Sequence, residues 1–164
     1  MAKPTCYVLV GFPGTGKTTY FQQHLAAECA HISSDRIIEE MATQAGKTYS
    51  EAWADCIGNA ATRSKMDFVG ALNRRQSIAY DQTNLSAKKR KEILSALPEE
   101  YERVCIYFRV IDQNVLRERL DARAAIGKKI SEKVISDMQK RFVEPHIVEG
   151  FHRLEVIDSC VPGA

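Results

Sequence analysis

Eight residues near the start of the chain constrain its fold more than any other stretch. Residues 11–18 read Gly-Phe-Pro-Gly-Thr-Gly-Lys-Thr and fit the pattern G-x-x-x-x-G-K-[ST] at every fixed position. The apolar run Cys6–Val10 before them is typical of a buried strand, and residues 19–30 after them are expected to form a helix. A strand, a glycine-rich loop and a helix in this order indicate a phosphate-binding loop rather than a turn that matches by accident.

The residue types in this loop suit the binding of a di- or triphosphate. Gly11, Gly14 and Gly16 permit positive φ angles and close backbone approach, so that successive N–H groups can surround phosphate oxygens. The N-terminal end of the following helix adds positive potential. Lys17 is expected to reach the β- and γ-phosphates, and the hydroxyl of Thr18 to bind the Mg²⁺ that bridges them. The residues of this loop that are expected to contact the nucleotide are Gly11, Pro13, Gly14, Thr15, Gly16, Lys17, Thr18 and Thr19.

Length and composition indicate an ordinary globular protein. The 164 residues suit one domain, residues 1–164, and the net charge of +2 is too small to indicate nucleic acid or membrane by itself. Five cysteines form no C-x-x-C pair, which is typical of reduced, buried thiols. No secretory segment precedes the first strand, and no apolar run approaches the ~20 residues of a membrane span. We expect a cytoplasmic protein, in a host cytoplasm if it is phage-encoded.

Strand and helix patterns alternate along the rest of the chain. Further strands are predicted at residues 31–33, 77–81, 104–108 and 154–157. Helix starts are predicted near Ser34, at the capping-box pattern Thr48–Glu51, and after Ser86, Asp112 and Ser131. This alternation implies right-handed βαβ crossovers, and therefore a three-layer α/β fold with a parallel sheet of about five strands and helices on both faces.

Two acidic residues follow predicted strands. Asp35 lies at the strand-to-helix junction after residues 31–33, where a parallel sheet presents its active edge. Asp81 ends the strand 77–81, the position at which an aspartate that binds Mg²⁺, directly or through water, is expected after a phosphate-binding loop. Thr18 and Asp81 are therefore the predicted metal ligands, whereas Asp35 could instead be a helix N-cap.

Several basic residues have two readings from the sequence. Arg119 and Arg123 lie four residues apart on one helix face, followed by residues 124–129, which include Gly127 and are predicted to be mobile. The long helix after Thr48 carries other basic residues, and residues 88–91 form a basic run. The long-helix set and the 88–91 run could each be a solvated helix face or a nucleic-acid contact. The basic residues of the long helix are Arg63, Lys65, Arg74 and Arg75.

Taken together, these segments resemble the kinase domain of the phage-type polynucleotide kinases, within the wider P-loop kinase family. The resemblance covers almost the whole chain. It rests on residues 11–19, on Ser33-Ser34-Asp35, on Asp-Gln-Thr-Asn-Leu at 81–85 and on the two arginines. A last match is Ile130-Ser131 with Val134, Ile135 and Met138.

This resemblance implies particular roles. Asp35 is expected to be the general base toward an acceptor hydroxyl, with Lys17, Arg119 and Arg123 as the other catalytic residues. The two arginines are expected to clamp the nucleotide phosphates from a small lid at about residues 117–130, although an exposed helix face is the alternative for this pair. ATP and Mg²⁺ are the implied nucleotide and metal, and no obligate protein partner is indicated.

One position departs from the family pattern. The family commonly places an arginine three residues after the aspartate to hold an acceptor phosphate, and here that residue is Ile38. Arg36 is nearby in sequence but is expected to point elsewhere. Phage kinases that phosphorylate the hydroxymethyl group of 5-hydroxymethyluridine in DNA are a related match, since they approach an internal base rather than a 5′ end.

The function expected from the sequence is transfer of the γ-phosphate of ATP to a hydroxyl of a polynucleotide, with DNA the first candidate. The acceptor would be a 5′-hydroxyl end or the hydroxymethyl group of a modified pyrimidine. A kinase for a nucleoside, sugar or antibiotic is the alternative. An ATP-hydrolysing switch or partner-binding module is a third reading, but Asp35 suits a bound alcohol better than a water molecule.

Overall fold

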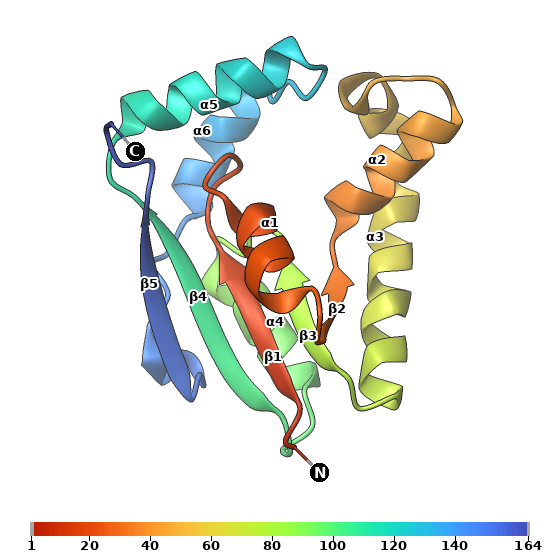
Figure 1. The fold of residues 1–164 in the computed structure, drawn as a ribbon, viewed down its shortest axis with the longest axis vertical. Helices are drawn as coiled ribbons and strands as arrows, with labels where there is room; N and C mark the ends of the chain where they lie inside the picture. Colours follow the sequence, from red (N-terminus) through yellow and green to blue (C-terminus); the bar gives the residue numbers. More distant parts are fainter. Residues whose placement is uncertain (1, 164) are drawn as a thin grey trace.

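The computed structural model describes residues 2–163. Its strands form one sheet in the order β2-β3-β1-β4-β5, and every neighbouring pair is parallel (Figure 1). The predicted α/β fold with a five-stranded parallel sheet is therefore confirmed. The strands are β1 (Thr5–Val10), β2 (Cys29–Ile32), β3 (Ser77–Asp81), β4 (Glu102–Val110) and β5 (Arg153–Ser159).

Helices connect the strands, and most begin where the sequence predicts. Ser86, Asp112 and Ser131 each accept a hydrogen bond from a backbone N–H of the helix that follows, and Thr48 with Glu51 forms both halves of a capping box. No helix within residues 2–163 has the length and apolar character needed to cross a membrane. The helices are α1 (Lys17–Tyr20), its π-helical continuation η1 (Phe21–Leu25), α2 (Ser34–Gln44), α3 (Tyr49–Asn73), α4 (Ala87–Ala96), α5 (Gln113–Ala125), α6 (Glu132–Arg141) and the 3₁₀ turn η2 (Ile147–Glu149).

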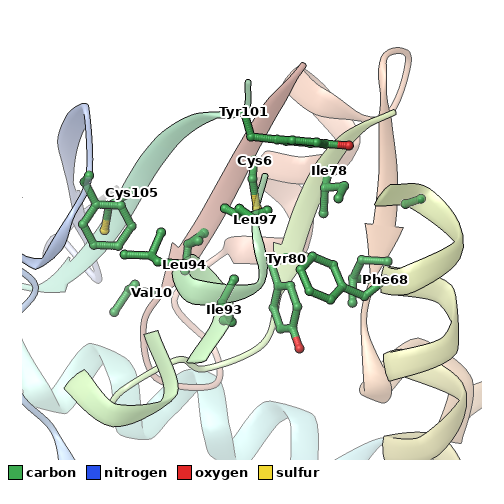
Figure 2. Packing of buried hydrophobic residues seen from close by; sticks show 14 of the residues in the cluster. Cys6, Val10, Phe68, Ile78, Tyr80, Ile93, Leu94, Leu97, Tyr101 and Cys105 are labelled. Atoms are coloured by element: carbon green, nitrogen blue, oxygen red, sulfur yellow. The ribbon is translucent and has the colours of Figure 1, made fainter. Parts of the chain in front are cut away.

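Both faces of the sheet are packed. On one face, Cys6 and Val10 of β1 share an apolar cluster with Phe68 of α3 and Ile93 of α4 (Figure 2). On the other face, Leu9 packs with Phe21 and Leu25 of the α1–η1 segment. Alternate residues of β1 thus point into two apolar layers, which is why the strand is a continuous apolar run. In Figure 1, α1 lies in front of the sheet and α4 behind it, while α5 crosses above the strand ends.

The helix after the phosphate-binding loop is shorter than predicted. Residues 19–30 were expected to be helical, but η1 ends at Leu25 and Cys29 already belongs to β2. Cys29 pairs with Ser77 of β3, so backbone hydrogen bonding to the sheet overrides the helical spacing of its side chain. Ser33, predicted to end the strand, is instead the N-cap of α2.

All five cysteines are free thiols, as expected for reduced side chains. Cys6 and Cys105 are fully buried, and burial raises the pKa of each to about 12, so that both remain protonated at neutral pH. The prediction of burial is wrong for Cys29 and Cys56, which are partly exposed.

Candidate active site

A cleft of about 850 Å³ opens at the carboxyl edge of the sheet. The phosphate-binding loop, the start of α2, the end of β3 and the second half of α5 form its walls. Gly11 and Thr15 of the predicted set do not line it. The predicted site residues that do line it are Pro13, Gly14, Gly16, Lys17, Thr18, Thr19, Asp35, Asp81, Arg119 and Arg123.

The glycines of the loop serve two purposes. Gly14 and Gly16 have φ angles of 84° and 94°, as the sequence predicts. Gly11 does not have a positive φ but shows the expected close approach, because a Cβ there would lie 2.8 Å from Thr15 Oγ1 and 3.1 Å from Phe108 Cβ. Thr15 Oγ1 in turn donates a hydrogen bond of 2.7 Å to the carbonyl of Phe12. Gly11 and Thr15 do not line the cleft, and their contacts therefore stabilise the conformation of the loop.

Lys17 lies inside the loop. Its Nζ donates hydrogen bonds of 2.8 Å to the carbonyl of Gly11 and 2.9 Å to that of Phe12. Only 9% of the residue is exposed, and this burial lowers the pKa of the ammonium from 10.5 to about 8, against the opposing effects of Asp81 and Asp35. The structure thus holds a poorly solvated cation where the motif predicts a phosphate ligand.

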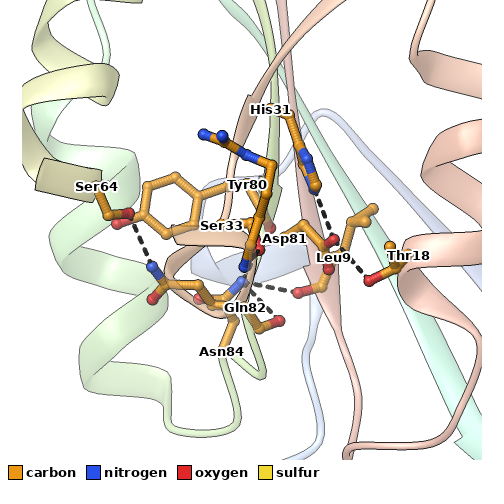
Figure 3. A network of polar contacts seen from close by, with 10 residues as sticks. Leu9, Thr18, His31, Ser33, Ser64, Tyr80, Asp81, Gln82 and Asn84 are labelled. Atoms are coloured by element: carbon orange, nitrogen blue, oxygen red, sulfur yellow. Dashed lines mark hydrogen bonds and ion pairs between the residues drawn. The ribbon is translucent and has the colours of Figure 1, made fainter. Parts of the chain in front are cut away.

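The predicted metal ligands meet at the end of β3. Thr18 Oγ1 donates a hydrogen bond of 3.0 Å to Asp81 Oδ2, and His31 Nε2 lies 2.8 Å from the same oxygen (Figure 3). The His31 ring stacks on Phe21, with centroids 3.8 Å apart. His31 was not identified from the sequence, because its approach to Asp81 depends on β2 lying beside β3. Strand order is not encoded in a local pattern.

The loop after β3 ties the site to the sheet. Asn84, buried and with φ of 49°, donates hydrogen bonds from Nδ2 to the carbonyls of Leu9 (2.7 Å) and Tyr80 (3.2 Å). The N–H of Gly11 donates to the carbonyl of Thr83 at 3.0 Å. These bonds join the ends of β1 and β3, and so place the phosphate-binding loop next to Asp81.

Asp35 lies in the first turn of α2 and faces the cleft. Ser33 accepts the capping hydrogen bond from the N–H of Arg36, so the alternative reading of Asp35 as N-cap is wrong. Asp35 Oδ1 accepts a 2.6 Å hydrogen bond from the hydroxyl of Tyr49 in α3. Burial, followed by the nearby Asp35 charge, raises the pKa of Tyr49. Tyr49 is therefore a neutral donor that orients the carboxylate.

Two neighbours of Asp35 differ in exposure. Ile38 is fully buried between α2 and α3, so its side chain cannot reach a molecule in the cleft. Arg36 lines the cleft, which corrects the expectation that it points elsewhere. Its Nη1 lies 2.5 Å from Glu40 and its Nη2 lies 3.6 Å from Asp67, so two carboxylates offset its charge.

Arg119 and Arg123 approach the loop from α5. Arg119 Nη1 donates a 3.2 Å hydrogen bond to the carbonyl of Gly14, and both arginines line the cleft. The structure therefore places the pair on the cleft wall and not on an outer helix face.

The segment that follows α5 lies beside the connection of α2 and α3 in Figure 1 and is hydrogen-bonded to the start of α3. The carbonyl of Gly127 accepts hydrogen bonds from the N–H (3.0 Å) and hydroxyl (2.7 Å) of Ser50, whose Oγ accepts one from the N–H of Lys129 (2.7 Å). Lys128 forms an ion pair with Glu39. Residues 126–129, here called the strap, thus join the two walls of the cleft. Ala124 and Ala125, predicted to be mobile, belong to α5.

Three residues of the basic stretches, Arg63, Arg75 and Arg90, form ion pairs with glutamates. Arg90, in the run 88–91, is fully buried; it donates to the carbonyls of Asn84 and Leu85 and pairs with Glu149 at 3.0 Å, so neither reading from the sequence holds for it. On α3, Arg63 pairs with Glu40, and after α3, Arg75 pairs with Glu100.

Solved structures with the same fold include three kinases or presumed kinases. A presumed kinase from Chloroflexus aurantiacus is 23% identical, with a TM-score of 0.69 over 99% of this chain and 88% of that one. A gluconokinase from Sinorhizobium meliloti is 16% identical, with a TM-score of 0.58 over 99% of this chain and 86% of that one. A fungal RNA kinase is 14% identical, with a TM-score of 0.58 over 100% and 78%. At these identities the likeness shows the P-loop kinase fold alone.

Sequence comparison agrees with the geometry of the loop and sheet. A family profile described as "AAA domain" matches residues 7–145, which include the phosphate-binding loop, both aspartates and both arginines of the cleft. Because this match spans most of the chain, the protein belongs to the AAA domain family, in its P-loop kinase-like form.

Proposed function

We propose that this protein is an ATP- and Mg²⁺-dependent kinase that transfers the γ-phosphate to a hydroxyl group of a polynucleotide. The observation that carries the proposal is the composition of a single cleft. Phosphate-binding cations, Lys17 with two arginines, line it together with a carboxylate, Asp35, that is suited to a hydroxyl. A phosphate donor and an alcohol could therefore meet in this cleft.

The cations act on the phosphate half. The ammonium of Lys17 can exchange its two carbonyl partners for phosphate oxygens, to which a charged donor binds more strongly. Arg119 and Arg123 can stabilise the charge that spreads over the transferred group.

The donor set at the end of β3 fits Mg²⁺. Thr18 Oγ1 and Asp81 Oδ2 are hard oxygen ligands 3.0 Å apart, and Mg²⁺ in kinases takes few protein oxygens together with phosphate oxygens and water. When bound, the ion supplies positive charge between the β- and γ-phosphates. His31 orients the carboxylate of Asp81 from the other side.

Asp35 acts on the acceptor half. Tyr49 holds its Oδ1, while Oδ2 has no hydrogen bond among the described residues and can accept the proton of the attacking hydroxyl. The resemblance of residues 33–35 and 81–85 to the polynucleotide kinases supports a nucleic-acid acceptor. A 5′-hydroxyl end and the hydroxymethyl group of a modified pyrimidine are both candidates.

A small-molecule acceptor is the second candidate, and the strap favours it. Contacts between residues 126–129 and the α2–α3 turn bridge the cleft walls, and a cleft of about 850 Å³ closed in this way suits a nucleotide with a compact alcohol. A polynucleotide would have to reach Asp35 as a flexible single strand or as a base turned out of the stack.

One labelling experiment tests the proposal. The protein is incubated with γ-labelled ATP, Mg²⁺ and, separately, 5′-hydroxyl DNA, 5′-hydroxyl RNA, hydroxymethyluracil DNA or small alcohols. Labelled nucleic acid is then digested to nucleotides by a nuclease, without phosphatase, and the labelled nucleotide is identified. We expect label on a polynucleotide, absent with Lys17→Ala. Label found only on small alcohols would replace the first candidate by the second.

A further inference from the structure

A polynucleotide acceptor brings phosphates of its own, and the acceptor side of the cleft offers no unopposed cation for them among the described residues. Arg36 is held by Glu40 and Asp67, and Lys128 is paired with Glu39. In the proposed function, Lys17, Arg119 and Arg123 bind the nucleotide rather than the acceptor. If a nucleic acid binds, its backbone must meet positive charge elsewhere.

A second hollow adjoins the cleft. This recess has a volume of about 250 Å³ and shares two wall residues, Gln82 and Thr83, with the cleft. Lys89 from α4 and Arg141 from the end of α6 also line it. The recess therefore continues the cleft along the loop that follows β3.

The fold holds both cations in place. Lys89 Nζ lies over the Tyr80 ring of β3, 5.6 Å from its centre, so a cation–π contact places the ammonium beside this strand. Arg141 is fixed beside the same loop, because the N–H of Val143 donates a 2.9 Å hydrogen bond to the carbonyl of Leu85. Neither cation has an ion-pair partner within residues 2–163. Two elements far apart in sequence thus present uncompensated positive charge to one small polar recess.

We propose that this recess is a subsite for a backbone phosphate of the polynucleotide acceptor, at a distance from the hydroxyl that reacts at Asp35. The proposal rests on the proposed function. An ammonium and a guanidinium bind phosphate oxygens through charge-assisted hydrogen bonds. The strand would pass from Asp35 over Gln82 and Thr83 to Lys89 and Arg141. Because phosphate contacts carry no base information, this subsite binds strands with little sequence preference.

Direct binding tests the subsite without catalysis. A single-stranded 5′-hydroxyl DNA labelled at its 3′ end is titrated with protein in the absence of ATP. Lys89→Gln with Arg141→Gln should weaken binding about tenfold or more and reduce the salt slope by about 0.7, the contribution of the one single-strand phosphate that the recess would hold. The matched control is Lys91→Gln with Lys140→Gln, which removes the same charge from exposed positions of the same helices outside the recess.

Kinetics separates this proposal from the function on which it rests. In the recess double variant, the KM for the oligonucleotide should rise about tenfold, with kcat and the KM for ATP unchanged. Activity on a nucleoside, which has no phosphate, should match the wild type.

Equal oligonucleotide binding and KM in the recess and control variants would overturn the subsite and leave the kinase proposal standing. A wild type that neither binds nor phosphorylates oligonucleotides overturns both proposals. Binding without transfer, lost in the recess variant, supports the subsite alone.

Discussion

If Lys17 binds the nucleotide as proposed, its buried ammonium should make nucleotide affinity depend on pH. In the free protein its pKa is about 8, because burial disfavours the charged form. Triphosphate charges beside it would raise this pKa, so the complex binds more protons than the free protein above pH 8. Affinity is therefore fully present below about pH 8 and falls as the pH rises above it.

This first prediction is checked by titrating an ATP analogue into the protein between pH 7 and 9.5 at constant Mg²⁺ and salt. Lys17→Ala should bind weakly at every pH, with no downward slope above pH 8, and should keep the wild-type fold. Affinity that stays constant through this range in the wild type would show that Lys17 is not the titrating phosphate ligand.

Asp35 should be needed for turnover more than for nucleotide binding. Removing a general base costs about 10²-fold or more in kcat, so Asp35→Asn should lose at least that much with its ATP affinity retained. Tyr49→Phe removes one hydrogen bond to Asp35 Oδ1 and should lower kcat about 2- to 10-fold. ATP affinity and kcat are measured on the same preparations. If affinity falls while kcat holds, Asp35 is structural.

Sequence reasoning found the residues whose positions follow from local spacing. Lys17, Asp35 and Asp81 each follow a strand end, and parallel strands bring such ends to one edge. His31 and Tyr49 were missed because they depend on β2 pairing with β3 and α2 packing on α3, which involve residues 50 and 14 positions apart in the chain. Arg90 was misread because its partner, Glu149, is 59 residues away.

At the scale of elements, α5 brings the two arginines to the phosphate-binding loop. Transition-state arginines contribute about 10³-fold or more to phosphoryl transfer. Arg123→Ala should therefore lower kcat by about 10²-fold or more, and Arg119→Ala by less, because Arg119 already bonds the carbonyl of Gly14. Single-turnover rates with saturating ATP measure both effects. The matched control is Arg117→Ala, on the same helix but not lining the cleft. Wild-type single-turnover rates in both Arg119→Ala and Arg123→Ala would show that neither arginine contributes to phosphoryl transfer.

The strap should loosen when its contact with the α2–α3 turn is disturbed. Gly127 has a φ of 90°, and a Cβ there would lie 2.9 Å from Thr48 Cβ, so Gly127→Ala strains this contact by about 1–2 kcal/mol. Trypsin should then cut after Lys128 and Lys129 faster than in the wild type, and bound nucleotide should slow the cut in both. Gly58→Ala, with open space around its Cβ, is the control. If trypsin cleaves Gly127→Ala at the wild-type rate, the contact between the strap and the α2–α3 turn does not protect Lys128 and Lys129 from cleavage.

Helix starts were predicted most accurately where the sequence has a side chain that can cap the first turn. Ser86, Asp112 and Ser131 cap their helices because a short oxygen-bearing side chain satisfies backbone N–H groups locally. The end of η1 was mispredicted because Cys29 belongs to β2 through pairing with Ser77, a contact that local periodicity does not reveal.

The whole molecule combines a parallel sheet, a phosphate-binding loop at the end of β1 and helix α5 across the strand ends. Under the proposed function, the nucleotide would occupy the half of the cleft formed by the loop, the end of β3 and α5, and the acceptor would occupy the half beside the start of α2 and the strap. The sheet order that brings Asp81 beside the loop could not be read from the sequence, but the presence of five alternating strands could. The central claim is that these two halves act together as a kinase.

The most direct test of that claim follows the γ-phosphate by ³¹P NMR in a mixture of protein, ATP, Mg²⁺ and 5′-hydroxyl or hydroxymethyluracil oligonucleotide. The account predicts that the γ-phosphate signal is replaced by an equal amount of a phosphomonoester on the oligonucleotide, and that Asp35→Asn slows this conversion about 10²-fold or more. Appearance of inorganic phosphate alone, at the same rate with and without oligonucleotide and in Asp35→Asn, would contradict it and identify an ATP hydrolase.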